Sequence, residues 1–152
     1  MSVEPYRLLV VANRTCPCPG LPGVILEHVR EHAEDRPAEV HVVAPALTSK
    51  LRWALSDVDG ALSAAEERLG IALMLLRDAG LPTTGEVGDA NPMQAIEDAL
   101  PAFAAHGVLI STWPQGRSNW LERDLVGRAR RRLDVDVHHV VSRFDAPVQV
   151  AA

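Results

Sequence analysis

The sequence has little cysteine, few aromatic residues and no long apolar run. Its 152 residues include two cysteines, one tyrosine and two phenylalanines. Two cysteines cannot build a disulfide framework, and in a reducing compartment we expect both as free thiols. No apolar run approaches the roughly 20 residues of a membrane-spanning helix, and the first residues, "MSVEPYR", lack the charged and then apolar pattern of a signal peptide. We therefore expect a cytoplasmic protein with no membrane partner.

Positive charge is also scarce. The chain has 15 lysine and arginine residues against 20 aspartate and glutamate residues, and its net charge is −5. Binding to nucleic acid needs a dense cationic field, which this balance does not supply, so we expect no nucleic-acid partner. The exception is the run "RARRR" at 128–132. It falls at the end of an expected helix, where exposed carbonyl groups favour positive side chains, and we interpret it as a solvated helix terminus.

What the sequence does have is the length and apolar content of one globular domain, because 47% of its residues are hydrophobic. We expect a single domain over 1–152, with a core at about 6–143 and a short C-terminal tail. Apolar segments of strand length predict five strands, at 7–13, 39–45, 83–87, 107–112 and 136–143. Between consecutive strands lie helix patterns that begin near 22, 56, 91 and 118.

The third of these helices has the clearest entry signal. Asn91 is a capping residue, Pro92 has no amide hydrogen where none is needed, and Gln94 stands three positions on, where a reciprocal cap would lie. Asp89 precedes this cap. We expect its carboxylate to order the turn and to take no part in acid or base chemistry.

Strands that alternate with helices predict right-handed crossovers and a parallel sheet. The fold class that we expect is α/β, a Rossmann-like three-layer sandwich with helices on both faces of a five-stranded sheet. In such sheets, ligands bind outside the carboxyl ends of the strands, at the point where the strand order reverses. The residues that directly follow the strands are therefore the candidates for a binding site.

The pattern resembles the universal stress protein (UspA-like) family, in its divergent actinobacterial form. The resemblance covers nearly the whole chain and is carried by "RLLVVAN" (7–13), "GDANPMQAIEDAL" (88–100) and the segment from "GVLISTWPQGRSNW" (107–120) onward. It implies the strand order 3-2-1-4-5, a stress-response role and frequent homodimers. One subclass of the family holds ATP between the first and fourth strands, so the resemblance also implies ATP as a possible ligand.

Two segments depart from the pattern of the ATP-binding members. In "STWPQGRSNW" only Gly116 remains of the glycine-rich part, and Trp113 and Pro114 do not offer the close backbone approach to phosphate that glycine permits. Asn13 stands where the family usually has an acidic residue after the first strand. Its amide can still hydrogen-bond a base or a sugar. The ligand that we expect is a small anion, with ATP or another adenine nucleotide as one candidate.

The candidate ligand-binding residues follow the first, second and fourth strands. They are Asn13, Arg14, Thr15, Val43, Ser111, Thr112, Gly116, Arg117, Ser118 and Asn119. The entry of the last helix offers free amides and partial positive charge, and Arg117 adds a fork of donors suited to phosphate or sulfate. Two alternatives stay open: the residues after the first strand cap it structurally, or Ser118 or Asn119 caps the last helix while Arg117 points to solvent.

The cysteines do not predict a metal site. Cys16 and Cys18 are separated by one residue, which is shorter than the usual ligand spacing of structural zinc sites, and no compact second pair of ligands lies nearby. Reversible redox chemistry is a further alternative. The interpretation that we favour is a stiff loop, in which Pro17 and Pro19 restrict the backbone and Gly20 permits the turn.

The histidines do not predict a metal site or a catalytic residue either. His138 and His139 are adjacent on a strand and point to opposite faces. His28 and His32 share one helix face, and we interpret them as surface residues. No nucleophile elbow or Ser-His-Asp grouping is visible at the strand ends, so we do not expect an enzyme.

Three functions follow, in order of preference. The first is a non-catalytic, regulatory domain that binds a small anionic ligand and acts through its dimer. The second is a dimeric interaction module whose degenerate site binds no nucleotide. The third is a nucleotide-alpha hydrolase-like enzyme, which shares the fold but has no visible site. The homodimer is expected because the fifth strand, with "VHHVV" at 137–141, would otherwise leave an apolar edge of the sheet unpaired.

Overall fold

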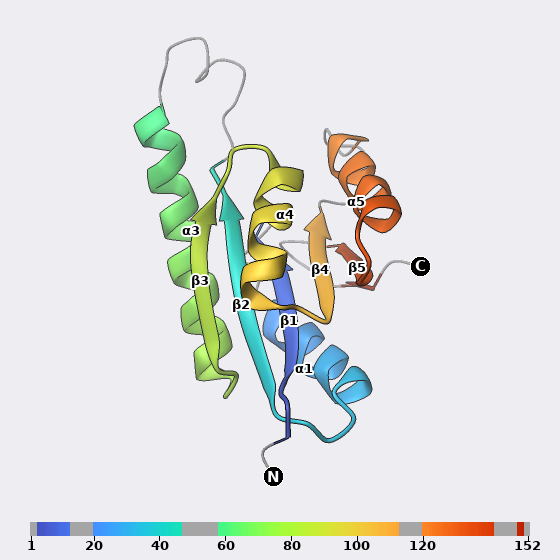
Figure 1. Ribbon diagram of the computed structural model, residues 1–152. Coiled ribbons are helices and arrows are strands. Elements are labelled where there is room, and N and C mark those ends of the chain that lie inside the picture. The colour runs from blue at the N-terminus through green and yellow to red at the C-terminus, as the bar shows by residue number, and fades with distance from the viewer. Residues whose placement is uncertain (1–2, 13–19, 47–57, 113–119, 142–148, 151–152) are drawn as a thin grey trace.

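The computed structural model describes residues 3–12, 20–46, 58–112, 120–141 and 149–150. These ranges form a sheet between two layers of helices, the α/β Rossmann-like sandwich that the sequence predicts (Figure 1). The strands are β1 (Tyr6–Val11), β2 (Ala38–Pro45), β3 (Thr83–Gly88), β4 (Gly107–Thr112), β5 (Asp136–Val141) and β6 (Gln149–Val150). The helices are α1 (Leu21–His32), α3 (Val58–Asp78), α4 (Pro92–Phe103) and α5 (Trp120–Arg132).

The sheet has the order β3-β2-β1-β4-β5-β6. Its first five strands are parallel, so the expected order 3-2-1-4-5 is confirmed. The sixth strand was not expected. It pairs antiparallel with the end of β5, where Val150 lies opposite Val140 and Gln149 lies opposite Val141. A later segment of the same chain therefore covers part of the edge that the sequence analysis left open.

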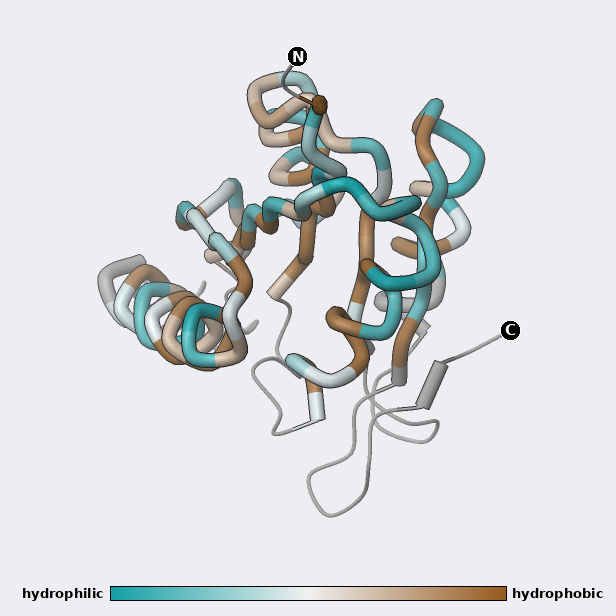
Figure 2. The backbone as a smooth tube through the Cα atoms, turned by 90° about the horizontal axis from the view of Figure 1, so that it is seen from below, coloured by the Kyte–Doolittle hydropathy of each residue, from teal (hydrophilic) through white to brown (hydrophobic). Residues whose placement is uncertain are grey.

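The central strand β1 is apolar because both of its faces are covered. Leu8 and Val10 belong to the core beneath α1 and α3, whereas Leu9 and Val11 belong to the core beneath α4 and α5, and all four side chains are 0% exposed. This is the continuous apolar pattern of a strand buried on both faces. Figure 2 shows the same separation along the backbone: hydrophobic residues lie in the strands, and the helices alternate between hydrophobic and hydrophilic residues.

The entry of α4 confirms the roles expected of Asn91, Pro92 and Asp89 but not that of Gln94. Asn91 Oδ1 accepts hydrogen bonds from the amides of Met93 (3.0 Å) and Gln94 (3.4 Å), and Asp89 Oδ1 accepts from the amide of Asn91 (2.8 Å). The reciprocal cap is wrong, because the Gln94 side chain donates to Asp98 Oδ1 at 2.7 Å instead. Asp89 already satisfies the amide that Gln94 was expected to bind.

None of the helices within the described ranges combines the length and the apolar character that crossing a bilayer requires.

Candidate functional site

The strand order reverses between β1 and β4, which are neighbours in the sheet. The helices that follow these two strands lie on opposite faces. Ile25 of α1 belongs to the core on one face, and Leu125 of α5 belongs to the core on the other. In parallel sheets, this arrangement opens a crevice outside the carboxyl ends of the two strands. The structure therefore contains the topological position at which the sequence analysis expects a ligand.

Three of the candidate ligand-binding residues lie in the described ranges. Val43 on β2 and Ser111 on β4 are each 0% exposed, and Thr112 is the last residue of β4. Val43 packs in the core beneath α4, and its carbonyl oxygen accepts a hydrogen bond of 2.8 Å from the amide of Ala12. These residues belong to β2 and β4, the two strands that flank β1.

The other candidates lie outside the described residues. They are Asn13, Arg14, Thr15, Gly116, Arg117, Ser118 and Asn119, and the same holds for Cys16, Cys18 and Trp113. The expectations for the opening loop and for the entry of α5 therefore stay predictions.

A glycine fixes the position of α4 at this end of the sheet. A Cβ atom at Gly88, the last residue of β3, would lie 2.8 Å from both Ala95 Cβ and Val43 Cγ2. Real Cβ atoms do not approach so closely, so only glycine lets the first turns of α4 lie this near to β2 and β3.

A second polar group, which the sequence analysis did not assemble, lies between α1 and β5. We call it the histidine cluster. It consists of His28 and His32 from α1 and His138 from β5. The ring centroids are 4.1 Å apart for His28 and His32, 4.2 Å for His28 and His138, and 5.0 Å for His32 and His138. One ligating nitrogen from each ring lies within 4.8 Å of those from the other two.

Local geometry and topology together build the histidine cluster. Residues four positions apart lie on the same side of a helix, so His28 and His32 project together near the end of α1. His138 lies beside Leu109 in the sheet, and Leu109 belongs to the core beneath α1. His139, the next residue on β5, lies beside Ile110 of the opposite core. The expected opposition of His138 and His139 is therefore confirmed.

Hydrogen bonds orient two of the three rings. His32 Nδ1 lies 2.9 Å from the carbonyl oxygen of His28, and since a carbonyl only accepts, this nitrogen carries the proton. His28 Nε2 and the Tyr6 hydroxyl form a hydrogen bond of 2.9 Å. Gly107 leaves room for that hydroxyl, because a Cβ atom there would lie 3.0 Å from it. His138 Nε2 is buried and has no hydrogen-bond partner within the described part of the chain.

Burial favours the neutral form of His28 and of His138. The pKa of His28 is lowered from 6.5 to about 3, mainly by burial and also by the neighbouring His138 and His32. Burial also lowers the pKa of His138, as does His32, whereas Asp136 acts in the opposite direction. Each neutral ring has one N–H group and one nitrogen with a lone pair. When all three rings are neutral, the cluster presents three lone pairs in a small volume.

The expectation that His28 and His32 are surface residues is wrong for His28. His28 is 8% exposed, and His32 is half-buried. The spacing of four residues was the available signal. It was insufficient because the third histidine, His138, comes from the last parallel strand, and only the packing of α1 against the sheet brings it near.

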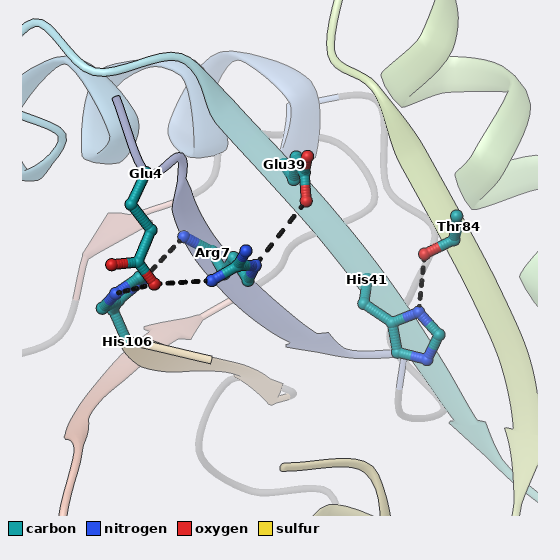
Figure 3. Close-up of polar contacts among 6 residues, drawn as sticks. All are labelled: Glu4, Arg7, Glu39, His41, Thr84 and His106. Carbon is teal, nitrogen blue, oxygen red and sulfur yellow. Dashed lines mark hydrogen bonds and ion pairs between the residues drawn. The ribbon is translucent and has the colours of Figure 1, made fainter. Parts of the chain in front are cut away.

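Another group of polar side chains lies toward the amino ends of the strands, and its members pair with one another (Figure 3). Arg7 of β1 forms ion pairs with Glu4 (2.9 Å) and Glu39 (3.7 Å), and its amide donates to His106 Nδ1 (3.0 Å). His106 also stacks on the Tyr6 ring, with centroids 5.7 Å apart. We interpret this group as structural, since its charges are matched within it.

Comparison with protein-family models and with curated protein sequences found no match to this chain. The function is therefore argued from the fold and from the residues themselves.

Proposed function

We propose that this chain is a universal-stress-protein-like domain that binds a small anionic ligand and has a regulatory, non-catalytic role. An adenine nucleotide is the candidate ligand, on the strength of the family resemblance. The observation that carries the proposal is the reversal of strand order between β1 and β4, with α1 and α5 on opposite faces of the sheet. Parallel sheets of this kind bind their ligands at that position.

The anion would be held where α5 begins. This helix starts at Trp120, directly after the segment that contains Arg117, Ser118 and Asn119. The first amides of a helix have no partners within the helix and lie at its positive end, so an anion there gains both hydrogen bonds and a favourable field. Arg117 would add a planar fork of donors.

The regulatory role is proposed to act through a homodimer. Among the described strands, β6 pairs with Val140 and Val141 alone, so it leaves residues 136–138 of β5 without a strand on their outer side. An unpaired strand edge is a template for association with a second chain. The dimer proposed here therefore uses the first half of β5.

The test combines mass spectrometry with thermal unfolding of the purified full chain. Native mass spectrometry reports both a retained nucleotide and the mass of a dimer. ATP or inorganic phosphate at about 100 times its Kd should stabilise the fold by about 2.7 kcal/mol, which raises Tm by roughly 5–10 °C. Arg117→Ala should lose most of this rise.

Arg128→Ala is the matched control, because Arg128 is an arginine of α5 itself and pairs with Asp124 at the surface of that helix (3.1 Å). It should keep the full rise in Tm. If no anion stabilises the wild-type chain, the proposed anion site is wrong, and the dimeric interaction module without nucleotide becomes the better account. A monomer mass at micromolar concentration would contradict the dimer.

A further inference from the structure

We propose that the histidine cluster is a binding site for a divalent first-row transition-metal ion, with Zn²⁺ as the ion that fits it best. The site is independent of the proposed anion site, because it lies between α1 and β5 rather than beyond the carboxyl ends of β1 and β4. Its ligands would be one nitrogen each from His28, His32 and His138.

The spacing of the three rings is close to that of a metal site. The ligating nitrogens lie within 4.8 Å of one another. In a tetrahedral site with Zn–N distances of about 2.0–2.1 Å, two nitrogens lie about 3.3 Å apart. Ring movements on the order of 1 Å close this gap. His32 is the last residue of α1 and is half-buried, so a small shift at the end of this helix moves its ring together with its hydrogen bond.

The hydrogen bonds prepare the rings for coordination. His32 Nδ1 donates to the carbonyl oxygen of His28, which leaves the lone pair of the neutral ring on Nε2. Histidine ligands in metal sites commonly donate their second nitrogen to a carbonyl group in this manner, and the bond fixes the tautomer and the ring orientation. When His28 Nε2 donates to the oxygen of the Tyr6 hydroxyl (2.9 Å), the lone pair of the ring lies on Nδ1, which is then the ligating atom.

The third ring supplies an observation of a different kind. His138 Nε2 is buried and lacks a hydrogen-bond partner among the described residues. A buried polar atom without a partner costs free energy, and native structures usually satisfy such atoms. A metal ion held by His28 and His32 would give this nitrogen a partner, since the centroid of the His138 ring lies 4.2 Å and 5.0 Å from those of the other two rings.

The ligand type selects the metal. Imidazole nitrogens suit zinc, copper and nickel, whereas calcium and magnesium prefer oxygen ligands. Three neutral ligands leave the full charge of the ion in place. They also leave one tetrahedral position for water or for an exogenous group, as in zinc sites with an open position. Asp136 contributes a nearby negative charge, which is opposed by Arg130 near His138 and by Arg36, whose guanidinium lies 5.6 Å from the Tyr6 ring centroid.

The test uses the untagged, metal-depleted full chain and titrates it with Zn²⁺ by calorimetry. We expect one equivalent of Zn²⁺ to bind. His32→Gln and His138→Gln should each weaken the affinity by about tenfold or more. The matched control is His139→Gln, which removes a histidine from the same strand but from the opposite face, and it should bind as the wild type does. His28 is left unchanged because its burial makes a folding defect the simpler result.

Two further measurements make every outcome decisive. A Cys16→Ser, Cys18→Ser variant should retain the site, and Co²⁺ bound to the wild type should give a visible tetrahedral spectrum without a thiolate charge-transfer band. Circular dichroism establishes that each variant is folded. The proposal is overturned if Zn²⁺ does not bind in one equivalent, if the cysteine variant loses it, or if His139→Gln weakens binding as much as His32→Gln.

Discussion

Two regions of the molecule, the carboxyl end of the sheet and the space between α1 and β5, carry different kinds of information about function. At the carboxyl end, the topology alone indicates a binding position, because the strand order reverses between β1 and β4. Between α1 and β5, the order of the strands does not indicate a binding position. The centroids of three imidazole rings nevertheless lie within 5.0 Å of one another there. One site follows from the architecture and the other from side chains. A search limited to the usual crevice of this fold would miss the second.

The largest expected effect concerns the buried histidines. For metal-free protein, the free energy of unfolding should fall as the pH falls from 6.5 to 4.5. In this window the unfolded chain protonates His28 near its ordinary pKa of 6.5, whereas burial holds the pKa of the folded chain at about 3. Each pH unit then costs up to about 1.4 kcal/mol. The lowered pKa of His138 adds in the same direction.

Urea unfolding at a series of pH values measures this dependence. His28→Gln should make it shallower, because the variant has no group to protonate at that position. An equal slope in the wild type and the variant would mean that the cluster is not electrostatically distinct from the rest of the sheet.

A second prediction tests the packing at the carboxyl end. Gly88→Ala should destabilise the protein by about 2 kcal/mol, since the new methyl group meets Ala95 and Val43, which belong to a packed core. Gly23→Ala is the control, because a Cβ atom there has nothing within 4 Å. That variant should be unchanged or slightly more stable. Denaturant midpoints compare the two, and equal stability would show that α4 can shift away from β3.

The smallest expected effect tests the hydrogen bond that orients His28. Tyr6→Phe removes the hydroxyl and should cost about 1 kcal/mol of stability. Gly107→Ala should have a similar effect, because its methyl group would lie 3.0 Å from the same hydroxyl. In both variants we expect weaker Zn²⁺ binding by calorimetry and an unchanged rise of Tm with phosphate. A change in the response to phosphate would instead show that the histidine cluster and the proposed anion site are coupled.

Much of the fold was predictable because its signals are local. The strand at 107–112 was predicted with the bounds that β4 has, and Asn91 caps α4 as its residue type and its position before Pro92 indicate. The reciprocal cap was predicted wrongly because the sequence does not show which of two nearby partners a side chain binds. Gln94 has two partners within reach, and it binds Asp98 because Asp89 already occupies the amide of Asn91.

Of the two candidate sites, one was predictable from the sequence and the other was not. The position of the anion site follows from the alternation of strands and helices, which the sequence displays. The histidine cluster depends on the packing of α1 over β4 and β5, where His138 lies beside Leu109. Periodicity shows that His28 and His32 share a face, but it does not show which distant residue that face meets. For this reason a local interpretation placed His28 at the surface.

The histidine cluster also has a consequence for the order of folding. It joins a helix near the beginning of the chain to a strand near its end, and β4 lies between β1 and β5 in the sheet. Contacts between segments so distant in the sequence form only after the intervening loop entropy has been overcome. The three rings therefore come together once β4 and β5 have docked onto β1. Their imidazole resonances would report that docking, whereas the resonances of α3 and β3 would report the opposite edge of the sheet.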